Sequence, residues 1–136
     1  MRILRQINTS AAIIALVCFF LPWVQVSCAG ARDTMSGIDL ARNGHGTLWF
    51  VPVLMGALVM STVIRMRREQ HGVVSFASML CGLISAYLMN GERLRVHDEA
   101  GLISAQLTGW FWLGFISTLA VAISGIAMLL KRQRAP

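Results

Sequence analysis

Charged residues are scarce in this chain. Only 13% of its 136 residues are Asp, Glu, Lys or Arg, whereas 56% are hydrophobic, and the mean hydropathy is +0.65. Soluble domains carry about 25% charged residues, so this chain has too little polar side-chain surface to cover a water-soluble globule. The composition therefore predicts an integral membrane protein in which residues 1–136 form a single domain.

Cysteine pairs are also missing. The sequence has three cysteines, Cys18, Cys28 and Cys81, and none belongs to a CxxC pair. Cys18 and Cys81 fall inside apolar runs, and Cys28 has no neighbouring cysteine. The spacing indicates no disulfide framework, and it favours a packed Cys28 over a reactive thiol.

Asp, Glu, Lys, Arg and His are absent from the four apolar runs, which cover residues 11–24, 48–64, 73–89 and 110–130. Pumps and ion-coupled transporters usually place such groups within the membrane, and a haem held there needs a histidine ligand. The pattern therefore argues against these classes. The rest of the chain shows no catalytic constellation, so we expect no enzyme activity and no cofactor, and the sequence leaves open a bound lipid.

Each apolar run, with its flanking residues, approaches the ~20 residues that a transmembrane helix needs. The sequence predicts an all-α membrane protein, a four-transmembrane-helix bundle with spans at about 9–26, 48–64, 73–89 and 109–130. Asn8, Thr9 and Ser10 are typical of the start of the first helix. A cleaved signal peptide is the alternative for this first segment, and Pro22-Trp23 fits it less well than a membrane interface.

The segments between the spans predict two extracytoplasmic loops, 27–47 and 90–108, and one cytoplasmic turn, 65–72. Polar and apolar residues alternate over 23–28 and again over 92–97, and 33–40 and 102–107 are suited to return strands. Each outer loop is therefore expected to form a short β-hairpin, and the two hairpins are expected to pair in one small sheet.

Eight of the twelve basic residues lie near the two termini or in the 65–72 turn. The positive-inside rule predicts that both termini are cytoplasmic in a bacterial inner membrane. The basic residues assigned to the cytoplasmic side beyond the first helix are Arg65, Arg67, Arg68, Lys131, Arg132 and Arg134. We expect them to contact anionic lipid headgroups rather than nucleic acid.

Tryptophan positions support the same polarity. All four lie at the outer ends of the apolar runs, where an interfacial aromatic belt is expected. These residues are Trp23, Trp49, Trp110 and Trp112.

Small residues recur at four-residue spacing in the last two apolar runs, a pattern that lets membrane helices approach closely. These faces are predicted to pack within the bundle or, alternatively, in an oligomer. The residues are Ser78, Gly82 and Ala86 in one run and Gly114, Thr118 and Ala122 in the other.

The outer loops carry the only candidate metal ligands that we single out, His45, His97 and Asp98. Nothing in their spacing requires them to converge, so a solvated histidine and a charged turn are the simpler interpretation of these residues. The sequence therefore predicts neither a metal site nor a catalytic site.

Three short segments carry a resemblance: LPWVQVSCAG at 21–30, SGIDLA at 36–41 and TGWFWL at 108–113. They resemble small bacterial four-span membrane proteins of unknown function. The layout is also similar to the claudin plan, which implies four helices under a small extracellular sheet. The chain departs from that family's outer loop because it has Cys28 alone and no cysteine pair.

The function favoured by these features is that of a structural or accessory subunit, which packs against other membrane proteins or against copies of itself without catalysis of its own. The first alternative is an oligomeric pore or small-solute transporter. Its lining would be hydroxyls at Ser61, Ser78, Ser85, Ser117, Thr118 and Ser124. The second alternative is a membrane enzyme or metal site on the outer face.

Overall fold

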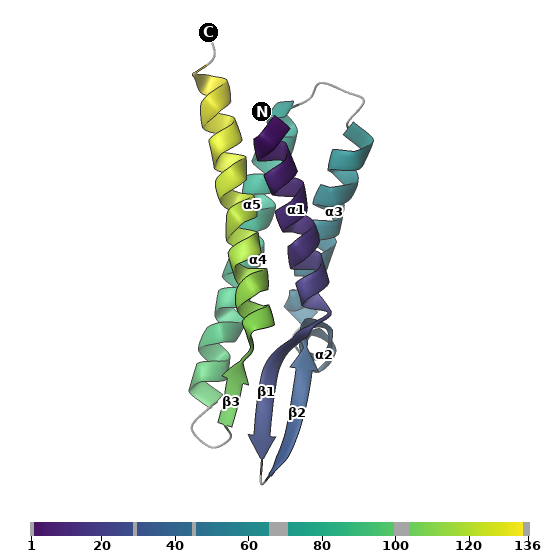
Figure 1. Ribbon diagram of the computed structural model, residues 1–136, viewed down its shortest axis with the longest axis vertical. Coiled ribbons are helices and arrows are strands. Elements are labelled where there is room, and N and C mark those ends of the chain that lie inside the picture. The colour runs from purple at the N-terminus through teal and green to yellow at the C-terminus, as the bar shows by residue number, and fades with distance from the viewer. Residues whose placement is uncertain (1, 29, 45, 66–70, 100–103, 135–136) are drawn as a thin grey trace.

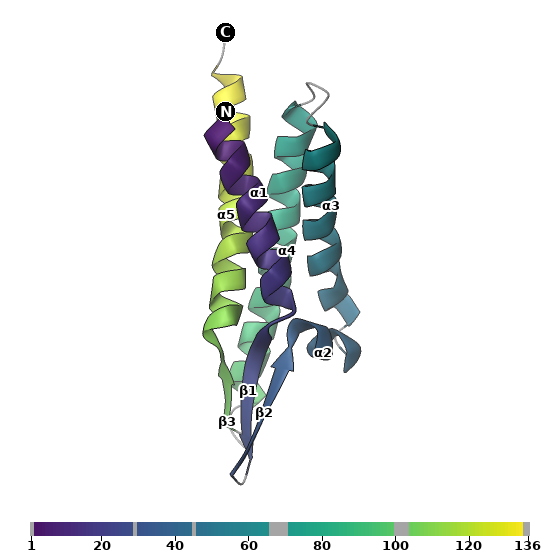
Figure 2. The same ribbon diagram turned by 45° about the vertical axis from the view of Figure 1, so that its right-hand side comes forward.

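The computed structural model describes residues 2–28, 30–44, 46–65, 71–99 and 104–134. Four helices run side by side: α1 (Arg2–Phe19), α3 (Phe50–Arg65), α4 (His71–Glu99) and α5 (Gly109–Gln133) (Figure 1). A small sheet lies at one end of the bundle, which we call the sheet end. The opposite end, where α1 begins and α5 ends, is the terminal end (Figure 2).

Three helical segments are long and apolar enough to cross a membrane: Gly46–Ile64, Gly72–Asp98 and Gly109–Gln133. The apolar part of α1, Ile3–Phe19, is shorter. Helix α1 is therefore not among the segments that length and composition alone identify as spans.

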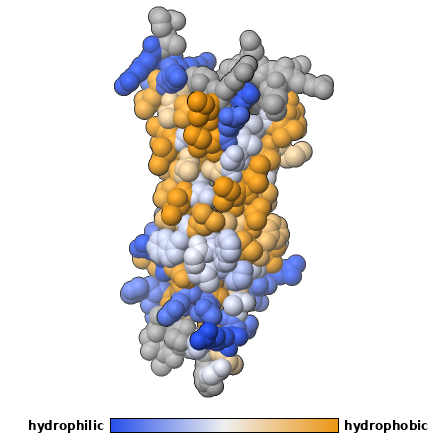
Figure 3. All heavy atoms as spheres, viewed as in Figure 1, coloured by the Kyte–Doolittle hydropathy of each residue, from blue (hydrophilic) through white to orange (hydrophobic). Residues whose placement is uncertain are grey.

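On the face that Figure 3 shows, a belt of apolar side chains crosses the middle of the bundle, with polar residues toward both ends. Large side chains in this belt are openly exposed; Val53 is 62% exposed, Phe76 52% and Ile123 65%. In water, such a continuous apolar surface would favour aggregation, whereas in a bilayer it contacts lipid chains. The belt therefore supports a membrane-embedded protein.

Helix α1 begins at Arg2 and ends at Phe19, so its bounds differ from the expected span of 9–26. Pro22 disfavours helical geometry at Leu21, which explains why the chain leaves the helix here. The last turn closes through the hydrogen bonds that the amides of Phe20 and Leu21 donate to Val17 and Cys18. The apolar residues that follow form a strand instead of a last helical turn.

The sheet has three antiparallel strands in the order β2-β1-β3. Strand β1 (Pro22–Cys28) turns through Gly30, whose φ of 88° suits glycine, into β2 (Ala31–Ser36). Strand β3 (Ser104–Leu107) pairs with the other edge of β1. The expected first hairpin is present, but its return strand ends at Ser36 and Gly37–Arg42 forms helix α2.

Helix α4 is 29 residues long and continues to Glu99, well past the expected end of its span at residue 89. The alternating segment 92–97 is therefore helical, and the second expected hairpin is replaced by the single strand β3. Tertiary packing explains the difference: Met89 and Val96, seven residues apart on α4, both pack in the cluster beneath the sheet. The 3₁₀ helix η1 (Gly46–Trp49) links α2 to α3.

Helices α4 and α5 approach very closely at Gly82 and Gly125. A Cβ at Gly82 would lie 2.6 Å from the Ala122 backbone nitrogen, and one at Gly125 would lie 2.6 Å from the Met79 nitrogen. The small faces expected from the sequence thus meet at Gly82 and Ala122. Gly114 lies between α1 and α4, since a Cβ there would lie 3.2 Å from the Cys18 Cβ and 3.4 Å from the Met89 Cε.

We predict that Gly82→Ala destabilises the bundle, because the added methyl group meets backbone atoms that cannot move without separating the two helices. The expected loss in unfolding free energy is about 1–3 kcal/mol. Thermal unfolding in a mild detergent, followed by circular dichroism, measures it.

Gly56→Ala in α3 is the matched control, because no atom lies within 4 Å of a Cβ at that position. It should leave stability unchanged or slightly raise it through helix propensity. Equal effects of the two substitutions would contradict the close α4–α5 approach.

Candidate functional site

Trp23 joins the sheet to the bundle. Its side chain is only 1% exposed, and its indole Nε1 donates a 2.7 Å hydrogen bond to the carbonyl oxygen of Cys18. Edge-to-face contacts connect its ring to Phe19 at 5.3 Å and Phe111 at 5.4 Å between centroids. Trp23 therefore lies in the core beneath the sheet, whereas the sequence placed it in the lipid-facing belt.

The other three tryptophans remain on the surface at this end, where Trp49 is 41% exposed, Trp110 48% and Trp112 39%. For these three residues the interfacial belt stays a prediction. The Arg93 guanidinium lies 6.0 Å from the centre of the Trp112 ring, so the extension of α4 contacts the start of α5.

The start of α5 is attached directly to β1. The Thr108 amide donates to the Trp23 carbonyl oxygen at 2.8 Å, and the Thr108 hydroxyl donates to the Pro22 carbonyl oxygen. On the other side, a Cβ at Gly37 would lie 2.8 Å from the Phe19 carbonyl oxygen, so α2 begins in contact with the end of α1. The sheet end is therefore attached to both α1 and α5.

Helix α2 begins with a capping box. The Ser36 hydroxyl accepts from the Asp39 amide at 3.2 Å, and the Asp39 carboxylate accepts from the Ser36 amide at 3.0 Å. The hydrogen bond from the Ser36 hydroxyl, followed by that from the Ser36 amide, lowers the pKa of Asp39.

We predict an acid-sensitive α2. Because the folded pKa of Asp39 is lowered, its cap stabilises α2 fully above the ordinary Asp pKa of about 3.9 and is lost as the pH falls through the lower folded value. Amide exchange in α2, corrected for its intrinsic pH dependence, should accelerate in that range. Asp39→Ala should abolish the transition and Asp98→Ala should retain it; a transition that persists in Asp39→Ala would refute the assignment.

Among the described residues, the candidate metal ligands form no cluster that could hold a metal ion. His97 and Asp98 are neighbours on the last turn of α4 and are both exposed, while His45 lies outside the described residues. No three His, Cys, Asp or Glu side chains within the described part of the chain are grouped as metal ligands. The basic residues Lys131, Arg132 and Arg134, predicted to be cytoplasmic, are exposed at the terminal end. The side chains of Arg65, Arg67 and Arg68 lie outside the part of the chain that the structure describes.

Asn8 is the centre of a buried polar network that the sequence did not indicate. It is 1% exposed, its Nδ2 donates to Ser78 Oγ of α4 at 2.9 Å, and its Oδ1 accepts from Ser124 Oγ of α5 at 2.9 Å. Ser78 in turn donates to the Val74 carbonyl oxygen at 2.8 Å. One amide side chain thus connects three helices near the terminal end.

The Asn8 network predicts how substitutions change the stability of the bundle. Replacing Ser78 and Ser124 together by Ala leaves the Asn8 amide buried without these two partners, which costs about 1–3 kcal/mol. Asn8→Leu removes the amide itself and leaves both serines bonded to their own helices, so it should cost less.

Thermal unfolding of the two variants and their combination forms a cycle that isolates the coupling. Ser61→Ala is the control, because Ser61 donates to the Leu58 carbonyl oxygen of its own helix and to no other helix among the described residues. A double serine variant as stable as the wild type would contradict the network.

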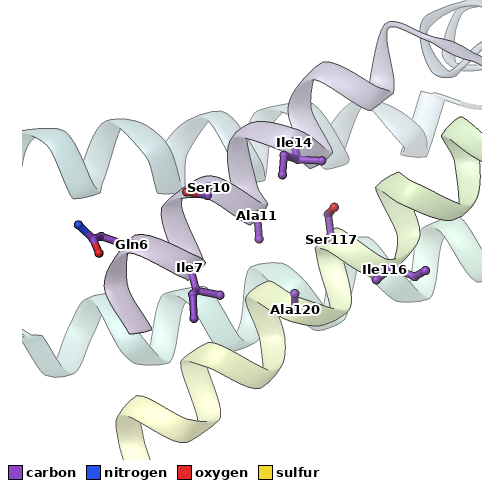
Figure 4. Close-up of a pocket in the computed structure, with 8 residues that line it drawn as sticks. All are labelled: Gln6, Ile7, Ser10, Ala11, Ile14, Ile116, Ser117 and Ala120. Carbon is purple, nitrogen blue, oxygen red and sulfur yellow. The ribbon is translucent and has the colours of Figure 1, made fainter. Parts of the chain in front are cut away.

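An open groove of about 380 Å³ runs along the surface between α1 and α5 (Figure 4). Small residues Ala11, Ser117 and Ala120 lie between the two helices, and the branched side chains of Ile7, Ile14 and Ile116 border them. Gln6 and Ser10 of α1 complete the lining. The groove lies in the apolar belt and is large enough for part of an elongated apolar ligand.

Comparisons with protein families, curated proteins and solved structures give no significant match. The features of the chain that bear on its function are therefore the groove, the buried network around Asn8 and the exposed apolar surface.

Proposed function

We propose that the chain is a four-span structural or accessory subunit of a bacterial inner membrane, with both termini in the cytoplasm. Helix α1 packs along α5 and α3 and contributes Ala11, Ala12 and Ala15 to the core. Its 18 residues correspond to about 27 Å of helix, close to the ~30 Å hydrocarbon thickness of a bilayer. These features support α1 as the fourth span.

The observation that carries the structural role is the way in which the intramembrane hydroxyls are used. Four of the six hydroxyls considered for a pore donate to carbonyl oxygens of their own helices: Ser61, Ser78, Ser117 and Thr118. Ser124 shares its one hydroxyl proton between the Val121 carbonyl oxygen and Asn8 Oδ1. Ser78 and Ser124 also bond Asn8. Hydroxyls satisfied in this way stabilise helix packing and offer few free groups to a passing solute.

Ser85 is the exception. Its side chain is fully buried on α4, and its Oγ has no hydrogen-bond partner among the described residues. The oxygen lies inside the protein, away from the lipid-facing surface. The pore alternative therefore depends on an oligomer interface formed by other surfaces, and the accessory role accounts for more of the described side chains.

The test is gentle extraction of the tagged chain from native membranes, followed by native mass determination. We expect stoichiometric foreign subunits or a defined homo-oligomer. A chain that is monomeric under every mild condition would refute the accessory role.

Reconstituted vesicles separate the pore from the scaffold. If the chain is a scaffold, the variant that carries Ser61→Ala, Ser117→Ala and Thr118→Val should assemble like the wild type. Neither the wild type nor the variant should then give solute flux. Solute flux that depends on these hydroxyls would establish the pore instead. An enzymatic or metal-binding activity that is lost in His97→Ala or Asp98→Ala would favour the outer-face site. Reporter fusions at both ends test the cytoplasmic termini.

A further inference from the structure

The groove between α1 and α5 has a polar end, and it is the terminal end. Gln6 and Ser10 line it on α1, and neither side chain has a hydrogen-bond partner among the described residues (Figure 4). Ile14 and Ile116 line its other end, toward the sheet, together with Ser117, whose hydroxyl donates to the Leu113 carbonyl oxygen of its own helix. A ligand that fits this arrangement has hydrogen-bonding groups at the terminal end and an apolar chain that extends away from them.

Two cations continue the groove along α5. Arg134 follows Ile116 by 18 residues, which is five helical turns, and Lys131 follows Ala120 by 11 residues, about three turns. Both therefore lie on the face of α5 that borders the groove, and both are exposed. Polar side chains gather at this end of α5 on the face that Figure 3 shows.

Arg132 occupies the same end but a different face. A Cβ at Gly72 would meet its guanidinium, which shows that Arg132 extends over the start of α4. The three basic residues at the end of α5 thus divide into a pair on the groove side and one residue directed away from it, while Arg5 lies next to Gln6 on α1.

The dimensions match one leaflet of a bilayer. Ile116 and Lys131 are 15 residues apart, or about 22 Å along the helix. Half of a bilayer, headgroup region included, is about 20–22 Å thick. A phosphate at the basic pair therefore places the end of an acyl chain beside Ile116.

From this juxtaposition we infer that the groove binds an anionic glycerophospholipid of the inner leaflet. One acyl chain lies over Ala11, Ser117 and Ala120, Gln6 and Ser10 bond the ester or headgroup oxygens, and Lys131 and Arg134 pair with the anionic headgroup. An apolar partner helix would fill the groove without using the two cations, whereas this lipid uses the whole set. The inference rests on the proposed membrane embedding of α1 but not on the accessory role.

The test uses the full chain in nanodiscs that contain equal amounts of phosphatidylglycerol and phosphatidylethanolamine. Lipid retained after transfer to detergent is identified by native mass spectrometry. We expect one phosphatidylglycerol to be retained preferentially. Each basic residue beside an anionic lipid contributes about a fivefold factor in affinity, so Lys131→Gln with Arg134→Gln should weaken retention by about 25-fold.

Arg132→Gln is the matched control for charge and should retain the lipid. Ala120→Leu fills the groove and should expel the acyl chain, whereas Ile123→Leu, at an exposed position of the same helix, should not. Thermal unfolding of each variant verifies that the bundle is intact.

Equal retention of both lipids, or equal loss in Arg132→Gln and the double variant, would overturn the inference, as would a protein helix cross-linked to the groove in place of lipid. These outcomes differ from failure of the accessory role, which appears as a monomer that still retains its lipid. Reporter fusions that place α1 outside the membrane would overturn the embedding and the lipid site together.

Discussion

A bilayer interior offers no water to a polar group, and this constraint shapes the entire chain. The Asn8 amide has to find its partners within the protein, and it finds them on two other helices at Ser78 and Ser124. Those serines can serve it because α4 and α5 cross closely at Gly82 and Gly125, where no side chain separates the backbones. Close packing and polar satisfaction therefore depend on each other.

The same requirement governs the place where α1 ends. The carbonyl oxygens of its last turn need hydrogen-bond donors. The Cys18 carbonyl oxygen accepts a hydrogen bond from the Trp23 indole Nε1. The bond draws Trp23 into the core, and β1 then fixes the position of α5 through Thr108. Trp23 and the strand that carries it thus connect the sheet to α1 and α5. These contacts attach the sheet end to the bundle.

The sequence was sufficient to predict three long apolar helices and the first hairpin because both depend on local pattern: unbroken apolar runs, and alternation interrupted by Gly30. It failed where long-range packing decides. Segment 92–97 alternates, yet Met89 and Val96 hold it in α4 through the cluster beneath the sheet. Asn8 resembled a helix-start residue, and only the approach of α4 and α5 reveals it as the buried centre of three helices. The groove likewise needs two helices from opposite ends of the chain.

The division of polar groups between interior and surface bears on function. Inside, Asn8 and the serines are mostly satisfied by one another and by backbone carbonyls, so the interior is suited to holding helices together. On the surface, Gln6 and Ser10 lie beside an apolar groove without described partners, and the cations of α5 continue the same face. Polar groups exposed to lipid are costly unless something satisfies them, and headgroup oxygens are the acceptors available at that depth. In the proposed accessory role, the polar groups inside the bundle hold the helices together, and the surface is left for lipid and for neighbouring chains.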